Sequence, residues 1–200
     1  MGSERAGEIV LAALMLLLAA PVHADEGNAE RGRKLAYTCM GCHGIENYKN
    51  AYPKYSVPKL AGQSATYIVA ALAEYVAGAR GHPTMKGMAT SLSVQDRADL
   101  AAWFQGPERA KPGTQPVGTM PAQATACTAC HGKDGIGTLP ENPTLAGQHA
   151  DYLAQALNDY RLGKRQNPIM NPFAGQLTRD DIDAIARYFS QQPGLHTPKP

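Results

Sequence analysis

Two short segments dominate the sequence: Cys39-Met40-Gly41-Cys42-His43 and Cys127-Thr128-Ala129-Cys130-His131. All four cysteines of the 200-residue chain belong to these two segments. Four cysteines are too few for a scaffold held together by many disulfides, so their spacing carries more information than their number.

The two cysteine segments lie in two copies of one repeated unit. Pro58-Lys59-Leu60-Ala61-Gly62-Gln63 recurs 85 residues later as Pro143-Thr144-Leu145-Ala146-Gly147-Gln148. The same offset relates Tyr67 to Tyr152, Tyr75 to Tyr160, Arg80 to Arg165, Met85 to Met170, Leu92 to Leu177 and Trp103-Phe104 to Tyr188-Phe189. The cysteine segments are offset by 88 residues, so the first copy has three extra residues before Pro58. The chain is therefore predicted to be a duplication of a unit of about 80 residues.

The local patterns in each copy are helical. Ser93-x-x-Asp96 and Thr178-x-x-Asp181 both match a capping box at the start of a helix. Helices are also predicted over 65–79 and 150–162, with a leading helix over 29–37 in the first copy only, because Pro116 and Pro121 disfavour one in the second. No convincing run of alternating strand residues occurs. The predicted fold class is all-α.

The domain organisation follows from the repeat and from composition. Residues 1–24 resemble a cleaved signal peptide, with Arg5, an apolar run from Ile9 to Ala20 and a small-residue cleavage site at Ala24. Glu4 and Glu8 leave an uncleaved anchor as the alternative. Predicted domains span 25–106 and 122–200, joined by a proline-rich linker over 107–121. Export would place the mature protein in the periplasm, with no transmembrane segment; peripheral membrane association stays open.

The composition excludes some classes of function. The chain is 44% hydrophobic and 18% charged, which suits a soluble globular protein. Removing residues 1–24 changes the net charge only from +2 to +3, too little to favour nucleic acid as a partner.

Each Cys-x-x-Cys-His segment is typical of covalent haem attachment. Cys39, Cys42, Cys127 and Cys130 are predicted to form thioethers to two haem c groups, and His43 and His131 to ligate the irons. A disulfide, a zinc site and a thioredoxin-like redox pair are the alternatives. A zinc ribbon has only about 15–20 residues between its cysteine pairs, and a thioredoxin-like pair needs a βαβ context.

Met85 and Met170 are the predicted sixth ligands, because they are equivalent in the repeat. Met88 and His82 are the local competitors of Met85, and their equivalents in the second copy are Phe173 and Asn167. A six-coordinate site of this kind favours electron transfer over catalysis.

On these motifs the chain resembles the dihaem cytochrome c4 family, that is, two class I cytochrome c domains in tandem. The resemblance covers essentially all of the mature chain. It implies that the carbonyls of Pro58 and Pro143 accept hydrogen bonds from His43 and His131. It also implies that the haem propionates lie near the domain interface, where the candidate contacts are Tyr67, Tyr75, Tyr152, Tyr160, Arg80 and Arg165.

The resemblance implies an electron-transfer protein of the respiratory chain and no enzyme. Its expected partners are redox proteins, with a terminal oxidase as the acceptor. The alternatives are a dihaem enzyme, of the peroxidase or thiosulfate-oxidising type, and an electron-entry subunit of a dehydrogenase complex. The sequence leaves open the donor and acceptor, the order of the two potentials and the oligomeric state.

Overall fold

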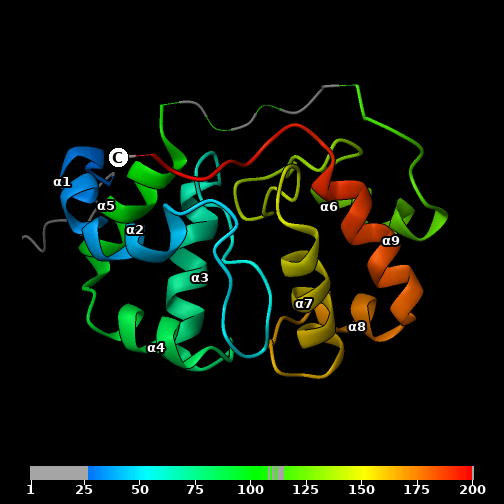
Figure 1. Cartoon of the computed structure of the whole chain (residues 1–200), viewed down its shortest axis with the longest axis horizontal. Helices are drawn as coiled ribbons and strands as arrows, with labels where there is room; N and C mark the ends of the chain where they lie inside the picture. Colours follow the sequence, from blue (N-terminus) through cyan, green and yellow to red (C-terminus); the bar gives the residue numbers. More distant parts are fainter. Residues whose placement is uncertain (1–26, 108, 110, 112–114, 200) are drawn as a thin grey trace, which may run out of the picture.

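The computed structural model describes residues 27–107, 109, 111 and 115–199. The predicted signal peptide and part of the predicted linker lie outside the described residues. Within them the regular structure is helical, and β structure is limited to isolated bridges. The predicted all-α class is confirmed. Figure 1 shows two groups of helices side by side, one from each copy of the repeat.

The first group holds five helices: α1 (Ala29–Leu35), α2 (Tyr37–His43), α3 (Ala65–Ala77), α4 (Pro83–Thr90) and α5 (Val94–Gln105). Helix α1 packs across α5 at very short range. A Cβ added to Gly32 would lie 2.0 Å from the carbonyl oxygen of Asp99, so only glycine permits this crossing. Asp99 is fully buried there and accepts hydrogen bonds from the backbone of Asn28 and from the side chains of Arg31 and Gln95.

The second group holds the 3₁₀ helix η1 (Ala122–Cys127), then α6 (Thr128–His131), α7 (Ala150–Arg161), α8 (Met170–Gly175) and α9 (Arg179–Ser190). The predicted loss of a full leading helix in this copy is confirmed, because η1 takes the place of α1. Gln192, almost completely buried, bonds the backbone of Val117 through both its amide oxygen and its amide nitrogen. The Gln192 side chain therefore connects the segment before η1 to the end of α9 by two hydrogen bonds.

Both predicted capping boxes are present. The Ser93 hydroxyl accepts from the Asp96 backbone N–H at the start of α5, and the Asp96 carboxylate accepts from the Ser93 backbone. Thr178 and Asp181 make the same pair of contacts at the start of α9. Each box satisfies two backbone N–H groups that a helix start otherwise leaves without partners.

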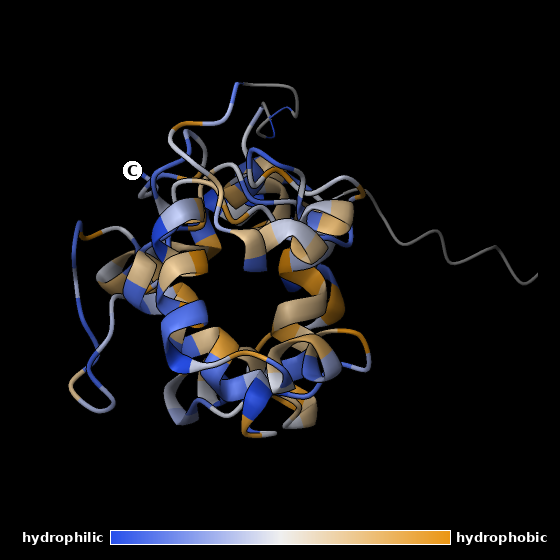
Figure 2. Ribbon diagram, turned by 90° about the vertical axis from the view of Figure 1, so that its right-hand side faces the viewer, coloured by the Kyte–Doolittle hydropathy of each residue, from blue (hydrophilic) through white to orange (hydrophobic). Residues whose placement is uncertain are grey.

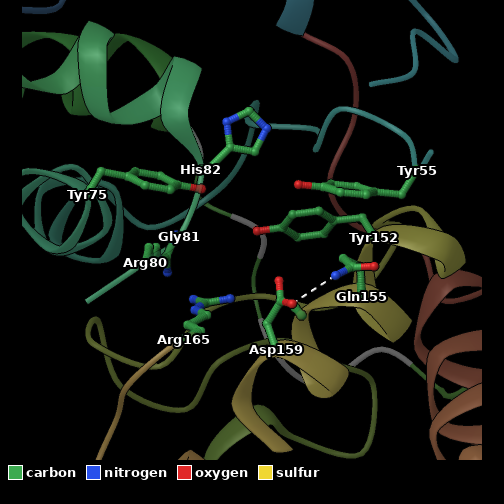
Figure 3. Close-up of a pocket in the computed structure, with 10 residues that line it drawn as sticks. Tyr55, Tyr75, Arg80, Gly81, His82, Tyr152, Gln155, Asp159 and Arg165 are labelled. Carbon is green, nitrogen blue, oxygen red and sulfur yellow. Dashed lines mark hydrogen bonds between the residues drawn. The ribbon is translucent and has the colours of Figure 1, made fainter. Parts of the chain in front are cut away.

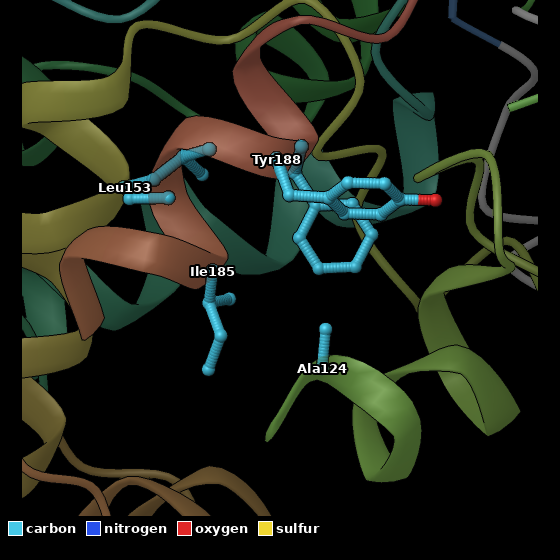
Figure 4. Close-up of a cluster of buried hydrophobic side chains, with 6 residues drawn as sticks. Ala124, Leu153, Ile185 and Tyr188 are labelled. Atoms are coloured by element: carbon cyan, nitrogen blue, oxygen red, sulfur yellow. The ribbon is translucent and has the colours of Figure 1, made fainter. Parts of the chain in front are cut away.

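The buried core of each domain is small. In the first it consists of Ala36, Ile68, Leu100, Ala101 and Phe104. In the second the main cluster consists of Ala124, Leu153, Ile185, Ala186, Tyr188 and Phe189, shown in Figure 4 between η1, α7 and α9, and Ile136, Ile182 and Leu195 are also buried in that domain. Figure 2 shows the helices as a ring seen end-on, with hydrophobic residues on several of its members. Units of this size with so little buried apolar surface need a further source of stability.

The repeated Pro-x-Leu-Ala-Gly-Gln segments join the domains reciprocally. Gln63 donates to the carbonyl of Thr144 and accepts from its N–H, both at 3.0 Å. Gln148 accepts from the N–H of Lys59 at 2.9 Å and donates to its carbonyl at 3.0 Å. Lys59 and Thr144 occupy the same position in the two copies, so the contacts follow an approximate twofold symmetry.

The C-terminal segment adds a contact between the two domains. It runs from the second domain back across the first (Figure 1), where His196 and Ala61 exchange two backbone hydrogen bonds of 3.2 Å. The neighbouring Leu195 is buried and donates its N–H to the carbonyl of Ala146. One short segment thus contacts the Ala-Gly positions of both repeats.

A search of the described residues finds no helix with the length and apolar character needed to span a bilayer.

Candidate haem sites and their interface

Helix geometry places the cysteines and the histidine of each Cys-x-x-Cys-His segment close together. All of Cys39–His43 lies within α2. Residues three and four apart lie on one face of a helix, so the sulfur of Cys39 shares a face with Cys42 and with the imidazole of His43. In the second domain Cys127 ends η1, and Cys130 and His131 follow in α6.

Each histidine ring is fixed by a proline carbonyl. Nδ1 of His43 lies 2.8 Å from the Pro58 oxygen, and Nδ1 of His131 lies 2.9 Å from the Pro143 oxygen. These are the two contacts implied by the family resemblance. A carbonyl only accepts hydrogen bonds, so Nδ1 carries the proton and Nε2 keeps its lone pair. Burial lowers the pKa of both imidazoles and keeps them neutral, as a metal ligand requires.

The two candidate methionine ligands begin equivalent helical turns. The Met85 N–H donates to Nδ1 of His82 at 3.2 Å, at the start of α4. The Met170 N–H donates to Oδ1 of Asn167 at 3.0 Å, at the start of α8. His82 and Asn167 are repeat counterparts, so each copy caps its methionine turn with a different side chain at the same position.

The contacts of His82 disfavour it as the alternative iron ligand. Its Nδ1 accepts from Met85, and its Nε2 lies 3.3 Å from Oδ1 of Asn50. Both ring nitrogens therefore have partners. Met88 lies one turn beyond Met85 on α4 and is half-buried. The choice of Met85 over Met88 stays a prediction.

A cluster of arginines and tyrosines lies between the domains (Figure 3). Arg80 and Arg165 have only 6% and 8% of their surface exposed and form a backbone bridge to each other. Arg80 pairs with Glu74 at 2.6 Å. The Arg165 guanidinium lies 4.4 Å from the centre of the Tyr160 ring, and its Nε is buried without a partner. A buried donor without an acceptor is costly, so this group is suited to an anionic ligand.

The residues present fit a covalently attached haem in each domain. Each copy offers two thiols, a neutral imidazole with a free Nε2 lone pair and a thioether. The porphyrin would supply the apolar surface that the small cores lack, and its propionates would supply acceptors for the orphaned Arg165 Nε. Whether the six candidate tyrosines and arginines contact the propionates stays a prediction.

The alternatives for the cysteines find no support. None of the four is paired in a disulfide. Across the described part of the chain, no group of three or more histidine, cysteine, aspartate or glutamate side chains is placed to hold a metal ion. A tetrahedral zinc site needs four such ligands.

Two roles were not predicted from the sequence: the capping of the methionine turns by His82 and Asn167, and the bridging of the domains by Gln63 and Gln148. The glutamines carry a usable signal, because they end the most strongly repeated segment although glutamine is seldom buried. The sequence signal for the two caps is weaker, because the equivalent residues His82 and Asn167 share little beyond a side-chain acceptor atom.

Comparisons with known proteins agree with this geometry. The family model for cytochrome c matches residues 29–106 and again 121–193. Cytochrome c4 of Stutzerimonas stutzeri is 36% identical, with 94% of this chain and 99% of the relative covered. The crystal structure of reduced recombinant cytochrome c4 from Pseudomonas stutzeri superposes with a TM-score of 0.64 at 34% identity, covering 85% of this chain and all of that one.

A relative with a different name matches over much of the same length. The thiosulfate dehydrogenase electron acceptor of Stutzerimonas stutzeri strain A1501 is 34% identical, with 78% of this chain and 79% of the relative covered.

Proposed function

The chain belongs to the dihaem cytochrome c4 family and carries two covalent haem c groups, and from that premise we propose that it is a periplasmic carrier delivering single electrons to a respiratory terminal oxidase. When bound, each haem supplies an iron that exchanges one electron without a change of ligands. The protein's own residues hold the ligands in place and join the two sites.

The proposed ligands are His43 with Met85 and His131 with Met170. The observation that carries the proposal is that both copies fix these residues by the same contacts: a proline carbonyl on Nδ1 of the histidine, and a side-chain cap on the methionine N–H. Such outer contacts set ring orientation and ligand basicity. Held by these four residues, the bound haems would exchange electrons with little rearrangement, and no ligand position would remain for a substrate.

The proposed acceptor can be tested with the haem-loaded protein. Reduced protein is added to membranes of the bacterium that makes it, and its oxidation is followed together with oxygen uptake. We expect the two rates to match and to stop when the oxidase is inhibited. Reduced protein that stays reduced while the same membranes oxidise another cytochrome would rule out this acceptor.

Cell fractionation tests the location: the mature chain should be released with the periplasmic contents.

A second candidate is an electron acceptor for a thiosulfate-oxidising enzyme. The similarity to a protein named for that role favours it. Mixing the oxidised protein with a purified thiosulfate dehydrogenase and thiosulfate distinguishes the two candidates. Reduction of both haems at rates far above those with thiosulfate alone would support this donor.

An enzymatic role for the chain itself has its own test. Peroxidase or thiosulfate chemistry at the haem needs an open or replaceable ligand position. Carbon monoxide added to the reduced, folded protein should leave the spectrum unchanged if the chain is a carrier. A carbon monoxide complex at either haem would favour the enzyme.

A further inference from the structure

Tyr67 occupies the centre of the domain interface. It lies on α3 of the first domain, and its hydroxyl oxygen accepts from Arg80 of the same domain at 2.8 Å. The same oxygen accepts from Arg165 of the second domain at 2.9 Å. One oxygen atom therefore holds the guanidinium groups of both domains.

The backbone around the two arginines repeats the twofold symmetry of the interface. Arg80 and Arg165 form an antiparallel bridge. The Gly81 N–H donates to the Lys164 carbonyl at 3.2 Å, and the Gln166 N–H donates to the Ala79 carbonyl at 2.8 Å. The two donors, Gly81 and Gln166, are repeat counterparts and report directly on whether the domains stay docked.

Tyr67 breaks this symmetry. Its repeat counterpart Tyr152 packs its ring against Tyr55, with the ring centres 6.3 Å apart. Within the described residues, the Tyr152 hydroxyl makes no hydrogen bond to either arginine. Figure 3 shows Tyr152 beside Tyr55, with both guanidinium groups near the middle of the interface. The two tyrosines therefore provide a variant and a matched control at equivalent positions.

The charges at the interface explain why a shared acceptor is needed. Two buried cations lie together, and among the described residues Arg80 forms an ion pair with Glu74 whereas Arg165 forms none within 4 Å. Asp159, the counterpart of Glu74, has a side chain one methylene shorter and accepts from Gln155 at 2.8 Å. Like charges in a poorly solvated site repel unless an acceptor lies between them. The Tyr67 oxygen is in that position.

The ionisation of Tyr67 agrees with this role. Burial alone would raise its pKa, but the charges and hydrogen bonds of Arg165 and Arg80 lower it to about 8. Hydrogen bonds from charged guanidinium groups to this oxygen are stronger than hydrogen bonds between two neutral groups. The other ionisable groups near the pair include Glu74, Tyr75, Tyr152, Asp159 and Tyr160.

We propose that Tyr67 is a positioning residue for electron transfer between the two haem domains, because its hydroxyl oxygen holds Arg80 and Arg165 together across the interface. The proposal rests on the carrier function proposed above. Tyr152 does not share this role, although it is the equivalent residue of the other copy. Loss of the Tyr67 oxygen removes the atom that hydrogen-bonds the guanidinium groups of both domains at once, so the docked arrangement opens more often.

The test compares Tyr67→Phe with Tyr152→Phe in the full-length, haem-loaded protein. Hydrogen exchange at the Gly81 and Gln166 amides measures opening of the interface. We expect about tenfold faster exchange in Tyr67→Phe, which corresponds to about 1.4 kcal/mol, and a clearly smaller change in Tyr152→Phe. Equal behaviour of the two variants, or wild-type exchange in both, overturns the proposal.

The second readout is the rate of electron transfer between domains after one haem has been reduced by a fast pulse. Tyr67→Phe should be slower than Tyr152→Phe while the spectra of both haems stay unchanged. A rate equal to that of the control shows that Tyr67 does not position the haems. If the wild-type protein itself transfers no electron between domains, the positioning role in electron transfer is overturned, whereas oxidation by the oxidase-containing membranes still tests the carrier function separately.

If Tyr67→Phe does not fold, 3,5-difluorotyrosine at position 67 keeps the ring and the hydroxyl while making it more acidic. The arginines should then hold it more tightly, and exchange at Gly81 and Gln166 should slow. Unchanged or faster exchange counts against the proposal.

Discussion

At the scale of single residues, ring and turn orientation are set by side-chain to backbone contacts. The Pro58 carbonyl fixes His43, and the His82 imidazole caps the turn that begins with Met85. The second domain makes both contacts with Pro143 and Asn167 in the equivalent places. The proposed ligands are therefore oriented by partners that are not themselves in the proposed ligand set.

Replacing each methionine by alanine tests the ligand set. Met85→Ala should abolish the methionine-to-iron absorption band of one haem and lower the potential of that haem alone, because a thioether ligand raises the potential. Met170→Ala should do the same for the other haem. Visible and near-infrared spectra of the oxidised proteins measure the effect. Met88→Ala is the control, and loss of the band in that variant would exchange the roles of Met85 and Met88.

The cap of the turn that holds Met85 can be tested by replacing His82 with alanine and with asparagine, the equivalent residue of the second copy. His82→Ala removes the acceptor for the Met85 N–H and should destabilise the first domain by about 1 kcal/mol, the usual cost of losing a cap. His82→Asn copies the second domain and should keep most of the stability. Denaturant unfolding of the haem-loaded protein measures both. An equal loss in the two variants would show that His82 acts by packing and not by capping.

At the scale of helices, the two copies differ most at the leading helix. Helix α1 crosses α5 at contact distance in the first domain, whereas the second has only η1 and the Gln192 contact to Val117. The repeat and the prolines of the linker were sufficient to predict this difference. The short helices α4 and α8 were not predicted, because their glycines and prolines gave no helical period.

Gly32→Ala tests the close crossing of α1 and α5. The new Cβ would meet the Asp99 backbone, and overpacking of this kind costs about 1–3 kcal/mol. Gly87→Ala on α4 is the control, because nothing lies within 4 Å of the Cβ it would add. Thermal unfolding should show a lower midpoint for Gly32→Ala and an unchanged or higher one for Gly87→Ala. A neutral Gly32→Ala would contradict the described packing.

The capping box of α5 should give the first domain a specific acid sensitivity. Hydrogen bonds from the Ser93 hydroxyl and backbone, and then from Arg31, lower the Asp96 pKa to about 2 from its usual 3.8. A carboxyl with a lowered pKa stabilises the fold fully above its ordinary pKa and loses that contribution as the pH falls toward 2. Asp96→Asn should therefore flatten the decline in unfolding free energy between about pH 4 and pH 2.

Asp181→Asn is the matched variant in α9. Asp181 makes the same capping contacts with Thr178, and within the described residues it has no ion pair with an arginine. We expect Asp181→Asn to flatten the acid decline less than Asp96→Asn does. An equal or larger effect would mean that Arg31 contributes nothing to the shift.

At the scale of the whole molecule, the duplication explains the interface. Equivalent positions of the two copies supply contacts across it: Gln63 contacts the backbone at Thr144, its counterpart Gln148 contacts the backbone at Lys59, and Arg80 bridges its counterpart Arg165. The sequence revealed the repeat and both haem sites, because those depend on local spacing. The repeat did not reveal that Gln63 and Gln148 face the other domain, because a repeat alone does not place one copy against the other. Only the family resemblance pointed to the tyrosines and arginines near the interface.

The asymmetric contacts were beyond prediction for the same reason. The insertion in the first copy brings Lys49 and Ser56 onto Asp151 of the second domain, at 2.8 Å and 2.9 Å. The counterpart of Asp151 in the first copy is Thr66, so nothing in the repeat pattern points to this contact. Such features depend on how the folded domains meet.

The central claim is that both domains hold a low-spin haem between a histidine and a methionine and exchange one electron each. A redox titration of the haem-loaded protein, with the spectrum of each haem followed separately, tests it most directly. We predict two one-electron steps, and a methionine-to-iron band for each haem that disappears as that haem is reduced. A single step with one haem per chain, or a high-spin haem without the methionine band in either domain, would contradict the account.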